Sequence, residues 1–159
     1  MKIDTVCVGK IKEKFFTQAL EEYQKRLSAY CDLSVIEVKD ENTPDNASAA
    51  VVEGILKTEG ERLMSKLRED AFVIALDIEG KSLSSEELAD KLSSLMTYGS
   101  SRISFVIGGS LGLHKSIKER ADLRLSFSKM TFPHQLMRVI LAEQIYRAFR
   151  IMKGQPYHK

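Results

Sequence analysis

The stretch SFVIGGSLGL, residues 104–113, decides the fold class of this chain. It opens with uncharged and mostly apolar residues, and three glycines, Gly108, Gly109 and Gly112, then follow within five positions. Glycine tolerates positive φ angles and lets a ligand or another backbone segment approach closely. The pattern therefore predicts a buried strand that leads into a tight loop at its carboxyl end.

Two further segments share this design. Residues 71–77, AFVIALD, form an apolar run shortly before Gly80, and residues 125–134, LSFSKMTFPH, alternate small hydroxyl and apolar side chains before Pro133. In open α/β sheets, ligands bind beyond the carboxyl ends of the strands. We therefore expect the three strand ends to meet at one ligand pocket.

Strand and helix patterns alternate along the whole chain. This alternation predicts a three-layer α/β fold with a mainly parallel sheet of five to six strands, in a single domain over residues 1–159. The strands are expected at residues 2–8, 33–38, 71–76, 102–107 and 123–127, and the helices at 16–30, 47–67, 84–99, 113–120 and 134–152. Ser84 and Glu87 form the pattern of a capping box at the start of the third helix.

Composition excludes several classes of protein. The chain has 43% hydrophobic and 29% charged residues, which is typical of a globular domain. No apolar run is long enough to span a membrane, and the start of the chain is too polar for a signal peptide. Cys7 and Cys31 are expected to be buried reduced thiols in a cytoplasmic protein. His114, His134 and His158 are not spaced as metal ligands, so we expect no metal site.

Positive charge is concentrated at the C-terminal end. The net charge is only +2, but residues 124–159 carry seven basic side chains and a single acid, Glu143. Such asymmetry points to nucleic acid as a partner. The candidates for phosphate contacts are Arg138, Arg147, Arg150, Lys153 and Lys159. Some of them have an alternative role in ion pairs with Glu143 or beside a subunit interface.

The motifs leave alternatives open. The glycine loop is neither a dinucleotide-binding nor a P-loop pattern, so its glycines serve either a structural turn or a ligand contact. Residues 125–134 form either a wall for an adenine or a helix start capped by Thr131 and Pro133. His134 is expected to be neutral at a helix N-terminus. The helix over 134–152 is apolar on most sides, so it is either central or a subunit interface, and we favour the interface.

Together, four motifs resemble the SPOUT-class ribosomal RNA large-subunit methyltransferase H family. They are LDIEG at 76–80, IGGSLG at 107–112, FSKMTFPH at 127–134 and PYH at 156–158, and the resemblance covers the whole chain. It implies S-adenosylmethionine-dependent methylation of nitrogen-3 of a pseudouridine in 23S ribosomal RNA, cytoplasmic homodimers and a C-terminal trefoil knot. The cofactor contacts that it implies are Leu76, Gly108, Phe127, Ser128, Lys129, Met130, Thr131 and Phe132.

The polar tail after the last helix is a candidate part of the active site. Our hypothesis is that Tyr157, His158 and Lys159 order over the target nucleotide, above the cofactor of the partner subunit, with Tyr157 and His158 as catalytic candidates. The alternative is a frayed terminus. A non-catalytic RNA-binding module and, less favoured, a nicotinamide-dependent oxidoreductase remain alternative functions. The sequence leaves open whether the substrate is free ribosomal RNA or an assembled ribosome.

Overall fold

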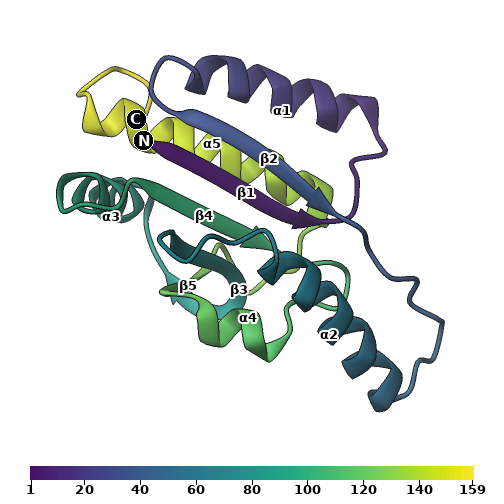
Figure 1. Cartoon of the computed structure of the whole chain (residues 1–159). Helices are drawn as coiled ribbons and strands as arrows, with labels where there is room; N and C mark the ends of the chain where they lie inside the picture. Colours follow the sequence, from purple (N-terminus) through teal and green to yellow (C-terminus); the bar gives the residue numbers. More distant parts are fainter.

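The computed structural model describes residues 1–159 as a parallel β-sheet between two layers of helices (Figure 1). The strands are β1 (Lys2–Val8), β2 (Asp32–Val38), β3 (Phe72–Ser82), β4 (Arg102–Ile107) and β5 (Leu123–Ser126). The helices are α1 (Lys14–Leu27), α2 (Ala49–Met64), α3 (Ser85–Thr97), α4 (Lys115–Arg120) and α5 (His134–Met152). The five strands are all parallel, in the order β2-β1-β4-β3-β5. The predicted three-layer α/β architecture is therefore confirmed.

Alternating side chains of the buried strands form two cores. Ile3 and Cys7 of β1 pack with α1, α3 and α5, whereas Val6 and Val8 of the same strand pack with α2 and α4. Figure 1 shows α1 and α5 on one side of the sheet and α2 and α4 on the other. Both faces are covered, which is why the central strands are apolar at almost every position. None of the helices combines the length and the apolar character needed to cross a membrane.

The chain changes faces between two neighbouring strands. β1 leads into α1 on one face of the sheet, whereas its neighbour β4 leads into α4 on the opposite face. The loops after these strands diverge, and such a switch point opens a crevice at the carboxyl edge of the sheet. This topology directs any ligand to the ends of β1, β4 and β3.

Strand β3 is longer than expected. The predicted strand ends at residue 76, but β3 runs to Ser82, because Leu125 of β5 pairs with Leu76 and, after a register shift, also with Lys81. Residues 77–80 bulge out between these two contacts. A β-carbon on Gly80 would lie 2.6 Å from the carbonyl carbon of Arg124, so this bulge packs directly on the backbone of β5. The structure thus ties β5 to β3 at two points.

Several local predictions are confirmed. The bounds of β4 and α5 are those expected, and Ser84 and Glu87 form the predicted capping box, with backbone-to-side-chain hydrogen bonds of 3.1 and 2.7 Å. Cys7 and Cys31 are free and buried. Burial raises the pKa of the Cys7 thiol to about 12 and that of the Cys31 thiol to about 11, so both stay protonated.

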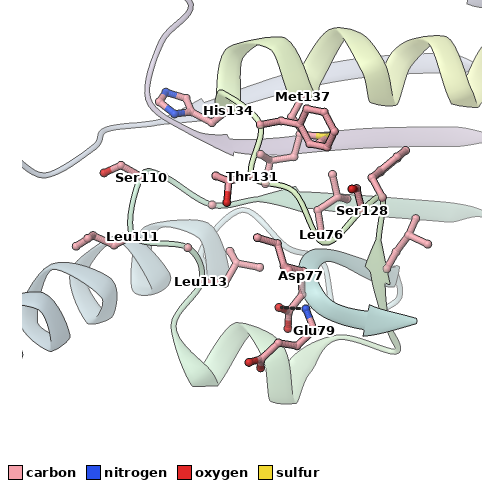
Figure 2. Close-up of a pocket in the computed structure, with 18 of the residues that line it drawn as sticks. Leu76, Asp77, Glu79, Ser110, Leu111, Leu113, Ser128, Thr131, His134 and Met137 are labelled. Atoms are coloured by element: carbon pink, nitrogen blue, oxygen red, sulfur yellow. Dashed lines mark hydrogen bonds between the residues drawn. The ribbon is translucent and has the colours of Figure 1, made fainter. Parts of the chain in front are cut away.

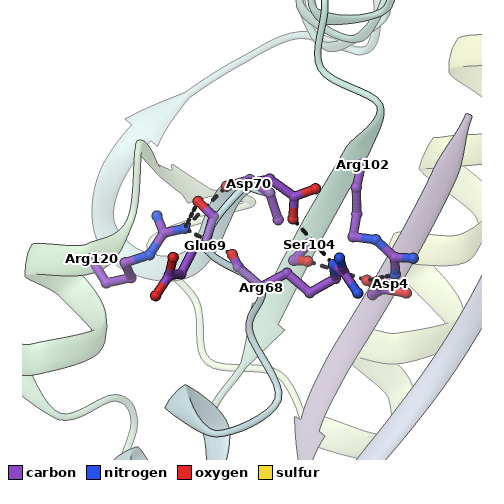
Figure 3. Close-up of polar contacts among 8 residues, drawn as sticks. Asp4, Arg68, Glu69, Asp70, Arg102, Ser104 and Arg120 are labelled. Atoms are coloured by element: carbon purple, nitrogen blue, oxygen red, sulfur yellow. Dashed lines mark hydrogen bonds and ion pairs between the residues drawn. The ribbon is translucent and has the colours of Figure 1, made fainter.

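Ion pairs stabilise the amino edge of the sheet, opposite the crevice (Figure 3). The buried carboxylate of Asp4 in β1 pairs with Arg102 of β4 at 2.6 Å and accepts a hydrogen bond from Ser104. Arg120, at the end of α4, donates to the carbonyl oxygen of Ala71 before β3. These contacts join strands that are far apart in sequence and leave the carboxyl edge free for a site.

Candidate functional site

A cavity of about 480 Å³ lies beyond the carboxyl ends of β3 and β4 (Figure 2). Three segments surround it: residues 76–79 of β3, residues 107–113 at the end of β4 and after it, and residues 127–132 between β5 and α5. Within the third segment, only Lys129 does not line the cavity. The three strand ends singled out in the sequence thus meet around one cavity. Half of the residues that line it are hydrophobic.

Seven of the eight residues that the family resemblance implies as cofactor contacts line this cavity. They are Leu76, Gly108, Phe127, Ser128, Met130, Thr131 and Phe132. Lys129, the eighth, has an exposed side chain and is not part of the lining. The structure therefore brings the implied set together apart from this lysine, and their contact with a cofactor stays a prediction.

The glycine loop after β4 folds back on itself. The amide of Gly112 donates to the carbonyl oxygen of Gly109 at 3.1 Å, and Gly112 has a φ of +89°. A β-carbon on Gly108 would lie 2.7 Å from the carbonyl carbon of Gly112 and 3.0 Å from the side chain of Leu113. Gly108 and Gly112 are thus required by the turn itself, and Ser110, Leu111 and Leu113 of the same loop line the cavity beside them.

The opposite wall is built by hydroxyl groups. Ser126 donates to the carbonyl oxygen of Ser128 at 3.2 Å, and the Ser128 hydroxyl accepts a hydrogen bond from the Met130 amide at 3.0 Å. The side chain of Met130 is 73% exposed. Pro133 is the N-cap of α5 and no side chain caps this helix, so the alternative in which Thr131 caps the helix start is wrong. Thr131 is left free to face a ligand (Figure 2).

Two carboxylates, those of Asp77 and Glu79, line the cavity. Asp77 accepts a hydrogen bond from the Glu79 amide at 3.1 Å (Figure 2), and its other oxygen pairs with Lys118 at 3.6 Å and Arg124 at 3.4 Å. Lys118 is the only lysine or arginine in the lining. A cavity that is half apolar and lacks a free cation cluster is unsuited to a diphosphate, but it suits a nucleoside with a small charged substituent.

Asp77 and Lys118 were not among the predicted site residues. Asp77 could have been found, because an acid directly after a buried strand lies at the edge where ligands bind. Lys118 could not, because its position depends on how the short helix α4 packs beneath the loop.

His134 lies where α5 begins, at the margin of the cavity. Figure 2 shows its imidazole pointing away from the other labelled side chains. Burial, followed by the charge of Arg138, lowers the pKa of His134, so the ring is neutral at pH 7. Neutrality was expected from the helix N-terminus, but desolvation is the larger cause.

The C-terminal tail folds back on α5 and α3. Tyr157 donates a hydrogen bond to Glu143 at 3.0 Å, and the two ring nitrogens of His158 contact Arg147 at 3.2 Å and Glu86 at 2.7 Å. Burial and the neighbouring Glu143 carboxylate raise the pKa of Tyr157 to about 12. In this arrangement the phenol is a hydrogen-bond donor and not a base.

The tail does not reach the cavity of its own chain. No residue of the tail lines the cavity, and Glu143, which holds Tyr157, lies six residues after Met137, the last residue of α5 in the lining. At 1.5 Å per residue, this is a displacement of about 9 Å along the helix from the margin of the cavity. The structure therefore groups Tyr157 and His158 with each other but not with the implied cofactor contacts.

The predicted phosphate contacts differ in their environments. Arg138 is wrong as a phosphate contact, because its side chain has 0% exposure and bonds to Glu37 at 2.7 Å and to two backbone carbonyls after β1. Arg147 pairs with Glu143, and Arg150 donates to the Tyr30 hydroxyl and to a tail carbonyl. The last two candidates, Lys153 and Lys159, are exposed and form no ion pair.

Comparisons with known proteins agree with this geometry. Residues 1–158 match the family described as predicted SPOUT methyltransferases. The chain is 57% identical to a protein of Carboxydothermus hydrogenoformans and 58% identical to one of Bifidobacterium adolescentis, both named ribosomal RNA large subunit methyltransferase H, over all of both chains. A solved structure of a probable methylase family protein from Haemophilus influenzae superposes with a TM-score of 0.55 at 14% identity, covering 99% of this chain and 70% of that chain. This last likeness concerns the fold alone.

Proposed function

Because this chain belongs to the SPOUT methyltransferase family, we propose that it transfers a methyl group from S-adenosylmethionine to large-subunit ribosomal RNA. The full-length relatives carry that activity in their names. The motif resemblance narrows the acceptor to nitrogen-3 of a pseudouridine. The enzyme works in the cytoplasm on ribosomal RNA or on an assembled ribosome.

The cavity beyond β3 and β4 is the observation that carries the proposal. Its apolar side chains, with Met130 and Phe132 at the wall, offer a surface for an adenine, and the backbone of the glycine loop allows close approach. Asp77 is matched by two cations, which leaves the exposed Glu79 as the one unpaired carboxylate of the lining. These features fit S-adenosylmethionine, which when bound supplies an electrophilic methyl group. They do not fit a dinucleotide, whose diphosphate would need free donors or cations.

The reaction sets two demands on the protein. The attacking nitrogen has to lie at near-attack distance, roughly 3–3.5 Å, from the methyl carbon, so much of the rate enhancement comes from positioning. The nitrogen also has to lose its proton, which requires a base or a cation that stabilises the anionic ring. The tail supplies candidates for the second demand: the imidazole of His158 and the ammonium group of Lys159, with the Tyr157 hydroxyl as a donor.

A homodimer would bring these groups to a cavity. No residue of the tail lines the cavity of its own chain, and Glu143, which holds Tyr157, lies about 9 Å along α5 beyond Met137 of that cavity. A tail held in this place would serve the cavity of a second copy. Leu136, Val139 and Ile140 of α5 remain partly exposed, which supports α5 as the contact between the copies. We therefore keep the hypothesis that Tyr157, His158 and Lys159 order over the target nucleotide above the partner's cofactor.

The trefoil knot also remains a proposal. Its support is the double pairing of β5 with β3 and the close packing of Gly80 on the backbone of β5. The segment after β5 then crosses from the edge of the sheet to the start of α5.

Two measurements test the function. Isothermal titration with S-adenosylmethionine and, separately, with NAD distinguishes a methyltransferase from an oxidoreductase, and we expect binding of the former only. Transfer of a tritiated methyl group to free ribosomal RNA, subunits and whole ribosomes distinguishes an enzyme from a passive RNA-binding module. If no particle accepts label from a protein that binds S-adenosylmethionine, the proposed rRNA substrate is wrong.

Deletion of the last three residues tests the tail. We expect cofactor binding and the dimer to persist while methyl transfer falls by at least a factor of about 100, since general acid–base groups contribute about 10² to 10⁴. Unchanged turnover would show that the tail is a frayed terminus.

A further inference from the structure

A second cavity, of about 500 Å³, lies beside the first, at the carboxyl ends of β1 and β2. We call it the lysine cavity. It is lined by Gly9, Lys10, Lys12, Glu37, Val38, Lys39, Asp40, His134 and Gln135, of which only Val38 is hydrophobic. His134 lines both cavities. Its Nε2 atom faces the lysine cavity, because a β-carbon on Gly9 would lie 3.9 Å from it.

The lysine cavity carries excess positive charge. Lys10, Lys12 and Lys39 are exposed, and none of them takes part in an ion pair. Glu37 is matched by the buried guanidinium of Arg138 at 2.7 Å. Three ammonium groups therefore face a single unmatched carboxylate, Asp40. Like charges gathered without partners favour the binding of an anion.

Hydrogen bonds fix the backbone of the loop after β1, which carries Lys10 and Lys12. The loop after β1 is tied to α5, because the Lys12 amide donates to the Gln135 side chain at 3.0 Å and Arg138 donates to the carbonyl oxygen of Gly9 at 2.7 Å. The same loop is tied to β2, because the Ile11 amide donates to Glu37 at 3.1 Å. The backbone of the cavity is thus ordered before any ligand arrives, which lowers the entropic cost of binding.

An exposed aromatic residue follows Lys12 by three positions in the chain. Phe15, in the first turn of α1, is 62% exposed and packs against Phe16 with ring centroids 4.5 Å apart. Lys14 beside it is also exposed. Ammonium groups next to an exposed ring are the combination that binds single-stranded nucleic acid, by phosphate contacts and by base stacking.

We propose that the lysine cavity binds a phosphate group of the ribosomal RNA strand close to the target nucleotide, with Phe15 stacking on a flanking base. This inference rests on the proposed function. His134 then stands between the site of the methyl donor and the site of the strand. The proposal also moves the expected phosphate contacts to the loop after β1. The C-terminal arginines are less suited to this role, because Arg138 is buried and Arg147 is paired with Glu143.

A triple variant tests this site. Lys10→Ala, Lys12→Ala and Lys39→Ala are combined and compared with a control triple, Lys25→Ala, Lys57→Ala and Lys66→Ala. The control lysines are exposed, form no ion pair and lie outside both cavities, so the two proteins have equal net charge. Thermal melting and titration with S-adenosylmethionine establish that both variants fold and bind the methyl donor.

The readouts are methyl transfer and RNA binding at several salt concentrations. For the cavity triple we expect the KM for the ribosomal substrate to rise at least roughly tenfold with kcat retained. We also expect the slope of log affinity against log salt to fall by about 0.7, since the cavity is proposed to bind one phosphate and each phosphate neutralised on a single strand contributes about 0.7. Equal KM values and equal slopes in the two triples would overturn the proposal, because the effect would then come from net charge alone.

Failure of the proposed function gives a different result. If the unmodified protein transfers no methyl group to any particle, the assigned activity is wrong. The lysine cavity is then judged by the salt slope for RNA binding alone, and a slope unchanged in the cavity triple would reject it as well.

Discussion

Gly108 packs directly against the backbone of Gly112, since a β-carbon on Gly108 would lie 2.7 Å from the carbonyl carbon of Gly112. The neighbour is backbone of the same loop, so a side chain cannot be accommodated by a rotamer change. The family resemblance implied this glycine as a cofactor contact, and the sequence pattern left a structural turn open as the alternative. The structure adds that the shape of the loop itself depends on it.

Gly108→Val should therefore displace the glycine loop and abolish S-adenosylmethionine binding. The overpacking should cost about 1–3 kcal/mol of stability, which leaves a folded protein in circular dichroism. Gly54→Ala is the control, because a β-carbon there meets nothing within 4 Å, and it should bind the cofactor normally and gain up to about 1 kcal/mol. Normal titration of Gly108→Val would place the cofactor elsewhere.

Arg138→Ala should be strongly destabilising. The guanidinium is buried and bonded to Glu37 and to the carbonyl oxygens of Val8 and Gly9, all of which lose this partner. Because Glu37 is partly exposed and keeps the hydrogen bond from the Ile11 amide, the expected loss is about 3 kcal/mol in urea unfolding, at the low end for a broken buried pair. Arg26→Ala breaks the exposed pair with Glu22 and should leave the urea midpoint nearly unchanged. Equal losses would contradict the structural role of Arg138.

Glu59→Gln should stabilise the protein at neutral pH. Burial raises the pKa of Glu59, with Asp40 and Glu41 adding to the shift, so folding favours the protonated acid. The contribution of this group to stability is present below its ordinary pKa of about 4.3 and is lost as the pH rises through the raised value. Glutamine keeps an acceptor for the Glu41 amide, which donates to Glu59 at 3.0 Å.

The measurement for Glu59 is the urea midpoint at two pH values. The variant should have the higher midpoint at pH 8, and the two proteins should converge near pH 4. If the urea midpoint of the variant exceeded that of the unmodified protein by more at pH 4 than at pH 8, folding would not raise the pKa of Glu59.

Phe15→Ala should weaken RNA binding without changing its dependence on salt. Stacking on a base contributes about 1–3 kcal/mol, and at the lower figure affinity falls roughly fivefold. No ammonium group is removed, so the salt slope should stay constant. Tyr98→Ala is the matched control, because Tyr98 is 86% exposed and lies before β4, at the opposite edge of the sheet. Equal affinities of the two variants would argue against stacking by Phe15.

Local pattern was sufficient to predict most of the fold. β4 ends as predicted because its apolar residues stop at Gly108, and α5 begins as predicted because Pro133 precedes it. The extension of β3 to Ser82 was missed, since Asp77, Glu79 and Gly80 make residues 77–80 resemble a turn. They stay in the strand because β5, some 45 residues later, supplies the second set of partners. The residues of one strand do not show which distant strand will pair with it.

The site, like the fold, was predictable only in part from the sequence. The glycine loop and residues 127–132 could be singled out because strand ends in such sheets gather at one edge. The burial of Arg138 was not predictable, because its partner Glu37 lies 101 residues earlier. The lysine cavity was missed for the same reason, since it is assembled from three segments that each look like an ordinary solvated loop.

The order of the strands has a consequence for how the protein folds. Lys2 of β1 pairs with Arg102 of β4, and Ile74 of β3 pairs with Leu123 of β5, so neighbours in the sheet are separated by long stretches of chain. During synthesis, about a hundred residues therefore have to be added after the start of β1 before β4, its second neighbour in the sheet, is present. High contact order slows folding toward the range of milliseconds to seconds. The protein should thus complete its sheet only after its last strand has left the ribosome.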